Sequence, residues 1–129
     1  MTLKTLSILL MSTLLLSGCA VNNSMYYWGD YSNTLYNWRK DATDERAVEH
    51  KAELAIVIEK SEAKGIRVPP GVYCEFGYML LMEGDMENAA SFFEKEAAEY
   101  PESEKFVSFL LTRCRESNSE EDSGDAQNN

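Results

Sequence analysis

Several residue types are scarce in this chain of 129 residues, and each scarcity excludes a class of protein. There is one histidine, and three cysteines are spread over the whole sequence, so no His/Cys set has the spacing of metal ligands. Lys and Arg number 12 against 22 Asp and Glu, and this acidity disfavours nucleic acid and anionic surfaces as partners. Gly-rich phosphate loops and nucleophile-elbow sequences are absent. We therefore expect no enzymatic activity, no bound cofactor and no metal.

The single histidine, His50, is the first residue to consider for chemistry. Its neighbours in the sequence are Glu49, Lys51 and Glu53, within a segment that we predict to be helical. No second histidine or cysteine lies nearby at ligand spacing. We therefore expect His50 to be a solvated surface residue.

Long hydrophobic runs are also missing, apart from one that spans Leu6 to Leu16 behind the charge of Lys4. Its length fits the core of a signal peptide, about 7 to 15 residues, and falls short of the roughly 18 that a membrane span needs. The run ends in Leu16-Ser17-Gly18-Cys19, which resembles the lipobox of bacterial lipoproteins. An ordinary secretory peptide, cut near Ser17, is the alternative interpretation.

The lipobox resemblance implies a location for the protein. Residues 1–18 would be the signal peptide, and Cys19 would carry diacylglycerol and palmitoyl chains as its only prosthetic groups. Several acyl chains together anchor a protein stably in a bilayer. Ala20 stands where an Asp would retain such a lipoprotein in the inner membrane, so the resemblance implies the periplasmic face of the outer membrane.

Composition divides the remainder into three regions. Residues 19–25 form a short polar tether that follows the lipidated cysteine. Residues 26–115 carry helical hydrophobic periodicity throughout. Residues 116–129 contain acidic residues, Ser and Asn but no basic residue, and we expect them to form a disordered acidic tail.

Aromatic residues are concentrated at the start of the helical region. We predict a first helix from Tyr26 to Lys40, on which Trp28, Tyr31, Leu35 and Trp38 form one stripe. The stripe can pack into the core of the protein. Alternatively, aromatic side chains beside a lipid anchor can contact a membrane interface, a glycan or a protein partner. The residues concerned are Tyr26, Tyr27, Trp28 and Tyr31.

The second predicted helix has clear ends. Thr43 can cap its N-terminus, and Gly65 follows Lys64 as a stop signal. Apolar residues spread over most of the helix surface, so we expect more than one neighbouring helix to cover it.

Residues 70–101 resemble one tetratricopeptide repeat. The matching residues are Tyr73, Phe76, Gly77, Leu80, Gly84, Ala89, Phe93 and Pro101, whereas Glu96 replaces a small apolar residue of the repeat. A single repeat needs neighbours to bury its apolar face, and a final helix from Ser103 to about Arg115 can provide one. We therefore expect an all-α fold, with about five helices in a short tetratricopeptide-like stack; a compact bundle is the alternative.

The same resemblance implies a binding surface. The first helix of a tetratricopeptide repeat lines a concave groove that holds peptides or proteins, and the corresponding residues here are Cys74, Tyr78, Leu81 and Met82. The alternative is that the aromatic N-terminal helix covers these residues.

Cys74 and Cys114 leave two interpretations open. They can form a disulfide in an oxidising compartment, or they can be two buried small hydrophobic residues. Their predicted offset along neighbouring helices favours the second interpretation.

Several longer segments are similar to a family of small proteobacterial lipoproteins that is built around a domain of unknown function. These segments are Tyr26–Tyr31, Leu35–Asp41, Arg67–Gly71 and Phe93–Glu96. Members tend to be encoded beside a lipoprotein similar to the curli secretion channel, which implies a cell-envelope assembly. We therefore expect a non-catalytic interaction or scaffold component of such an assembly, with an envelope protein and the lipid bilayer as partners. The alternative is a binding module for peptidoglycan or a small apolar ligand.

Overall fold

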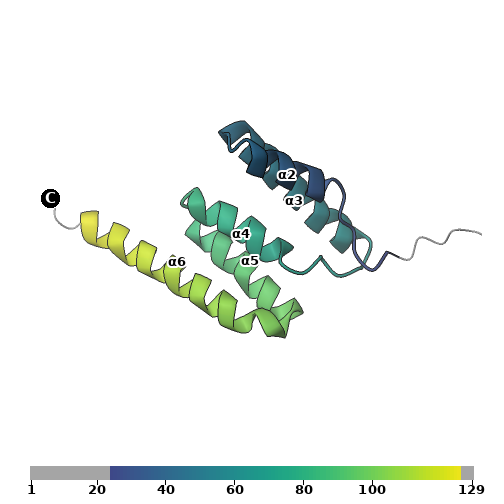
Figure 1. The fold of residues 1–129 in the computed structure, drawn as a ribbon. Coiled ribbons are helices and arrows are strands. Elements are labelled where there is room, and N and C mark those ends of the chain that lie inside the picture. Colours follow the sequence, from purple (N-terminus) through teal and green to yellow (C-terminus); the bar gives the residue numbers. More distant parts are fainter. Residues whose placement is uncertain (1–23, 126–129) are drawn as a thin grey trace, which may run out of the picture.

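The computed structural model describes residues 24–125, with side chains up to Glu116, and its architecture is all-α as predicted. Five α-helices follow one another, and one short 3₁₀ helix precedes the last (Figure 1). Their bounds are α2 Tyr31–Lys40, α3 Asp44–Ala63, α4 Val72–Met82, α5 Met86–Glu99, η1 Pro101–Ser103 and α6 Glu104–Asp125. None of these helices is long and apolar enough to cross a membrane. The predicted signal peptide 1–18 and Cys19 lie outside the described residues.

The helices form a stack in which each packs mainly on its neighbours in the sequence. α2 pairs with α3, α4 with α5, and α5 with α6, while α3 and α4 join the two halves (Figure 1). This order of contacts is typical of a repeat-like stack, and it differs from a compact bundle in which distant helices share one core. The core accordingly divides into two clusters, one around Leu54 and Val57 on α3 and one around Phe93 on α5.

Local signals set most helix ends where the sequence predicts them. The Thr43 side chain accepts a hydrogen bond from the backbone N–H of Arg46, so it caps α3 as expected. Gly65 follows the end of α3 with φ +62°, a conformation that glycine adopts without steric cost. Asp85 caps α5 by accepting from the N–H of Asn88, and Pro101 follows the end of that helix.

The first helix begins later than predicted. α2 starts at Tyr31, whereas we expected a helix from Tyr26. Gly29 has φ +50°, and the N–H of Tyr31 bonds to the carbonyl of Trp28, so a turn precedes the helix. Trp28 therefore lies outside the helix, and the predicted stripe of four aromatic and aliphatic residues on one helix is wrong.

The last helix continues beyond its predicted end. α6 runs from Glu104 to Asp125, although we expected the helix to end near Arg115 and a disordered tail to follow. No proline or glycine occurs between Glu104 and Ser123, so nothing in this stretch breaks a helix. Residues 126–129 lie outside the described residues.

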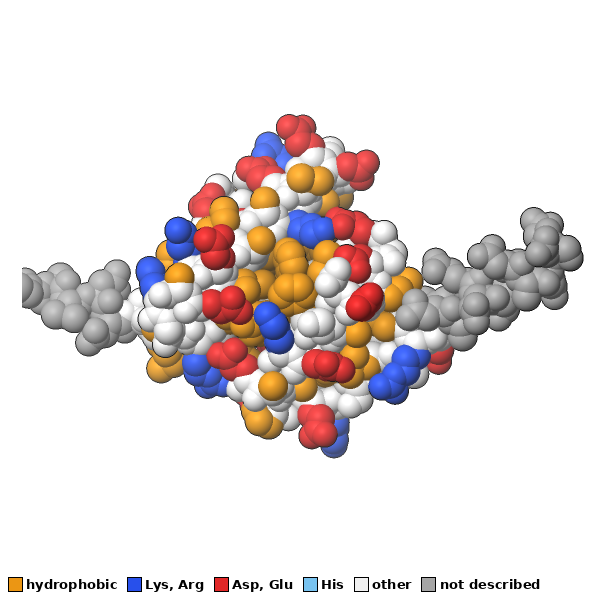
Figure 2. Space-filling model, turned by 180° about the vertical axis from the view of Figure 1, so that it is seen from behind, with side chains coloured by type: hydrophobic (Ala, Val, Ile, Leu, Met, Phe, Trp, Pro, Cys, Tyr) orange, Lys and Arg blue, Asp and Glu red, His pale blue; other side chains and the backbone are white. Residues whose placement is uncertain are grey.

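As predicted, more than one helix packs on the wide apolar surface of α3, but two of its large apolar residues stay exposed. Val48 is 66% exposed and Ile56 is 41% exposed, because α2 and α4 contact other sides of the helix. On the back of the molecule, hydrophobic side chains gather in a central hollow with charged side chains around it (Figure 2). The sequence thus predicts that α3 has more than one neighbour, but which of its apolar residues stay exposed follows from the stack.

Candidate binding groove

A groove lies between α4 and α6, where the sequence analysis predicts a binding surface. α5 packs against both α4 and α6, and this arrangement holds the two outer helices apart along one side. Two adjoining cavities of about 600 and 510 Å³ lie there and share Tyr78, Phe109 and Leu110. Leu81, Met82, Met86, Arg113 and Glu116 complete the first, and Gly71, Cys74, Glu75 and Phe106 complete the second.

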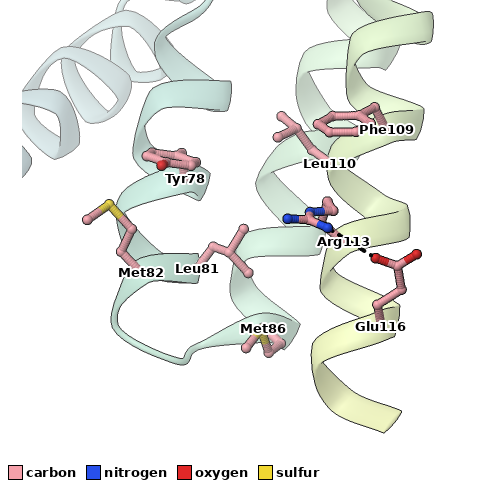
Figure 3. Close-up of a pocket in the computed structure, with 8 residues that line it drawn as sticks. All are labelled: Tyr78, Leu81, Met82, Met86, Phe109, Leu110, Arg113 and Glu116. Atoms are coloured by element: carbon pink, nitrogen blue, oxygen red, sulfur yellow. Dashed lines mark hydrogen bonds and ion pairs between the residues drawn. The ribbon is translucent and has the colours of Figure 1, made fainter. Parts of the chain in front are cut away.

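The α4 side of the groove contains all four residues that the sequence analysis placed there. Tyr78 is 48% exposed and Met82 is 67% exposed, while Leu81 is half-buried and Cys74 is buried at the base. In Figure 3, Tyr78 and Leu81 lie on α4 across the groove from side chains of α6. The aromatic N-terminal helix does not cover these residues, since α2 packs on α3 instead. That alternative is therefore wrong.

The sequence analysis did not predict the α6 side of the groove. We predicted the last helix as a packing neighbour of the repeat without separating its core side from its exposed side, and Phe106 and Phe109 are 58% and 60% exposed. Among residues 104–116 of α6, the buried ones are Val107, Leu110 and Cys114, which form a separate stripe. The i, i+3 spacing of the two phenylalanines gives a second apolar stripe beside the first, and this signal was present in the sequence.

Charged groups border the groove without filling it. Arg113 pairs with Glu116 at 3.5 Å at one end, and both side chains are largely exposed (Figure 3). Glu75 lies at the other end, where it belongs to a separate polar network. Apart from these charged groups at its two ends, the lining is mainly apolar and aromatic, which suits an apolar peptide or helix.

The cysteine at the base of the groove is a thiol in a nonpolar environment. Cys74 and Cys114 are both free and both buried, so the interpretation as two small hydrophobic residues is confirmed. Burial, assisted by the nearby charge of Glu96, raises the pKa of Cys74 to about 12. Burial also raises the pKa of Cys114. Neither thiol has the electropositive, accessible environment of a reactive cysteine.

Glu96 supports the start of the groove helix. Although it departs from the repeat pattern, it is 1% exposed and its Oε1 accepts a hydrogen bond of 2.8 Å from the N–H of Gly71, just before α4. Its Oε2 is buried and has no hydrogen-bond partner among the described residues. Desolvation raises the pKa of Glu96, and the backbone N–H groups at the start of α4 oppose this shift.

His50 is buried, and the expectation of a solvated histidine is wrong. Its side chain is 0% exposed; Nδ1 lies 2.9 Å from Oγ1 of Thr34, and Nε2 lies 3.1 Å from Oε1 of Glu75. The ring also stacks on Trp38. Residues adjacent in the sequence point in different directions on a helix, so the charged neighbours of His50 did not indicate its environment.

The network around His50 connects three helices. Tyr31 on α2 donates a hydrogen bond of 2.8 Å to Oε2 of Glu75, which also contacts His50 on α3. Burial and this bond to Glu75 raise the pKa of Tyr31 to about 12. Thr34, His50 and Glu75 resemble a catalytic triad in composition, but Thr34 is 5% exposed and its hydroxyl donates to the carbonyl of Tyr31. A substrate therefore has no access to this hydroxyl, and we assign the network a structural role.

The aromatic N-terminal residues occupy a different surface. Tyr26, Tyr27 and Trp28 line an open depression with Lys64 and Ile66, while Tyr31 belongs to the His50 network. The structure thus divides the predicted contact residues into two surfaces and an internal network. No group of three or more His, Cys, Asp or Glu that could hold a metal occurs within residues 24–116.

The fold and the groove define the class of protein: an all-α helical stack with an open apolar groove. Its described residues contain no candidate metal cluster. Comparison with known protein families matches residues 25–110 to the family described as domain of unknown function DUF4810. Because the match spans more than half of the chain, the protein belongs to this family. No curated protein and no solved structure matches the chain.

Proposed function

We propose that this protein is an outer-membrane lipoprotein that binds a partner protein of a cell-envelope assembly in the groove between α4 and α6. The observation that carries the proposal is the exposed aromatic pair Phe106 and Phe109 facing Tyr78 of α4 across an open apolar groove. Apolar surface of this kind is costly to leave in water, and it is typical of interaction sites.

The geometry favours an apolar peptide or helix as the bound element. α4 has 11 residues, so at about 1.5 Å per residue the groove is roughly 16 Å long, which accommodates about three helical turns. Most wall residues between the two ends are large and apolar, and the ion pair of Arg113 and Glu116 limits one end. An amphipathic helix presenting one apolar stripe fits such a groove. A curli-channel-like lipoprotein is one candidate source of this element.

We also infer that α4 and α5 form a tetratricopeptide-like repeat. A Cβ added to Gly77 on α4 would lie 2.9 Å from the ring of Phe93 and 3.1 Å from the carbonyl oxygen of Ala89, so the two helices approach closely where the repeat has small residues. The proteobacterial lipoprotein identity is proposed on the lipobox at Cys19, which is a sequence feature.

Affinity purification from membranes after mild detergent extraction tests this function. We expect one envelope protein to copurify with the wild-type chain and to be lost from Phe109→Ser and Tyr78→Ser. Tyr36→Ser is the matched control, because Tyr36 is 61% exposed and lies on α2, away from the groove. Equal recovery from all variants, or no partner at all, contradicts the proposal. Wild-type binding of a small apolar compound without any protein partner favours the alternative ligand-binding function.

A further inference from the structure

The end of the molecule that follows the lipid anchor carries an aromatic surface that the groove does not use. Met25 is 73% exposed and Trp28 is 41% exposed, beside the half-buried rings of Tyr26 and Tyr27. Tyr26, Tyr27 and Trp28 border an open depression of about 640 Å³ that Lys64 and Ile66 also line. We refer to this set, with Ser24 and Gly29, as the anchor-proximal surface.

The rings of this surface lie close to other aromatic rings and to one lysine. Trp28 lies 6.4 Å from Tyr26 and 5.2 Å from Tyr31, measured between ring centroids. The ammonium of Lys64 lies 4.4 Å from the centre of the Tyr27 ring. Aromatic rings together with lysines whose aliphatic chains lie along apolar surface are typical of proteins at a membrane–water interface.

The length of the tether brings this surface close to the bilayer. Ser24 is the first described residue and is five residues beyond Cys19. At no more than about 3.6 Å per residue, the tether holds Ser24 within roughly 18 Å of the acylated residue. The headgroup region on each side of a bilayer is several ångströms thick, so the anchor-proximal surface is within reach of it.

The direction of the helices relates this surface to the groove. The start of α2, the end of α3 and the start of α4 all lie at the end of the stack where the N-terminal chain enters (Figure 1). Lys51 of α3 pairs with Glu83 after α4, and Tyr73 near the start of α4 bonds to Glu62 near the end of α3, which shows that these helices are antiparallel. The groove along α4 thus begins at this end and runs away from it.

We propose that the anchor-proximal surface rests on the bilayer that holds the acyl chains, with Trp28 and Met25 in the interface and the helices directed away from the membrane. This inference rests on the lipid anchoring in the proposed function. The bilayer is the one partner that acylation would keep permanently within reach of these residues. Contact with it removes Met25 and Trp28 from water and leaves the groove between α4 and α6 open to the periplasm.

Tryptophan fluorescence of the full-length acylated protein in vesicles of phosphatidylethanolamine and phosphatidylglycerol tests the proposal. The chain has two tryptophans, so Trp38→Phe leaves Trp28 as the single reporter. We expect its emission to shift to shorter wavelength on insertion and to lose most of its intensity with lipids brominated in the acyl chain. The emission of the wild type minus that of Trp28→Phe also gives the emission of Trp28. This second measurement leaves Trp38 unchanged.

The matched control places the reporter at the other end of α4. In a chain with both native tryptophans changed to phenylalanine, Met82→Trp introduces an exposed reporter at the last residue of that helix. We expect this tryptophan to remain accessible to iodide in water and insensitive to brominated lipid.

Flotation of the vesicles separates the two claims. A chain that does not float with the vesicles contradicts the lipid anchor of the proposed function, and with it this inference. A chain that floats while Trp28 remains as accessible to iodide as Met82→Trp contradicts this inference alone. Retention on purified peptidoglycan that is lost in Trp28→Phe, with no lipid quenching, would assign the surface to a glycan and also overturn it.

Discussion

The carboxylate of Glu96 on α5 accepts a 2.8 Å hydrogen bond from the N–H of Gly71, so a buried acid supports the start of the helix that forms one wall of the groove. Glu96→Ala leaves this N–H without its acceptor, and we expect a loss of about 1–3 kcal/mol in the free energy of unfolding. Glu96→Gln retains an acceptor and removes the buried charge, so its stability at pH 7 should equal or exceed that of the wild type. Urea denaturation measures all three free energies.

The raised pKa of Glu96 predicts a specific pH dependence. Because its pKa is higher in the folded state than in the unfolded chain, the folded state binds more protons between the two values. Stability contributed by this group is therefore complete below about pH 4.5 and is lost as the pH rises through the raised value. The difference in stability between wild type and Glu96→Gln should follow this curve. A stability difference that does not change with pH contradicts this prediction. Glu94→Gln, at an exposed position on the same helix, is the control.

His50 should contribute strongly to stability because it fills space and bonds to two helices. His50→Ala removes a fully buried ring and leaves Thr34 and Glu75 without this partner. We expect a loss of about 2–4 kcal/mol by thermal or urea denaturation. Glu49→Ala, at the adjacent exposed position, should change stability by less than about 0.5 kcal/mol. Similar small effects for both variants would show that His50 is solvated, as its sequence neighbours indicate.

Gly77 tests the close approach of α4 and α5. Alanine gains up to about 1 kcal/mol of helix propensity over glycine. The added Cβ, however, would meet the backbone oxygen of Ala89 at 3.1 Å, which cannot move as a flexible side chain can. We expect Gly77→Ala to lower the free energy of unfolding by about 1–3 kcal/mol. Ser91→Ala, exposed on α5, supplies the reference. A stabilised Gly77→Ala protein would contradict the packing described here.

The two buried thiols should be unreactive in the folded protein. Burial raises the pKa of Cys74 to about 12, so very little thiolate is present near pH 8. We expect iodoacetamide to label neither Cys74 nor Cys114 in the native state and to label both in denaturant, as read from the intact mass. Denatured protein that accepts no label on either residue without a reductant would instead reveal a disulfide.

Sequence reasoning was accurate where the determining residues are close together in the chain. Thr43 caps α3 through a residue three positions away, and Gly65 ends the same helix through its own backbone conformation. Sequence reasoning failed where the determining contacts join residues that are far apart in the chain. His50 bonds to Glu75 and Glu96 bonds to Gly71, each over a separation of 25 residues, and no local pattern shows that either polar residue will be buried.

Only the α4 wall of the groove was predicted, again because local patterns are visible in the sequence and contacts across the fold are not. The repeat pattern placed Cys74 and Tyr78 on the face of α4 that lines the groove, because that face follows from helical periodicity within one segment. The opposite wall depends on how α6 packs against α5, which decides that Leu110 is buried and Phe109 is exposed. Both residues are apolar, so composition alone does not show which of them is buried and which is exposed.

Site-specific photocrosslinking in living cells tests the central claim most directly. A photoreactive phenylalanine analogue replaces Tyr78 or Phe109 in the groove, or Tyr36 on α2 as the exposed control. The account predicts that both groove positions crosslink to the same envelope protein and that Tyr36 does not. Crosslinking that is absent from the groove positions, or equally strong at Tyr36, would contradict it.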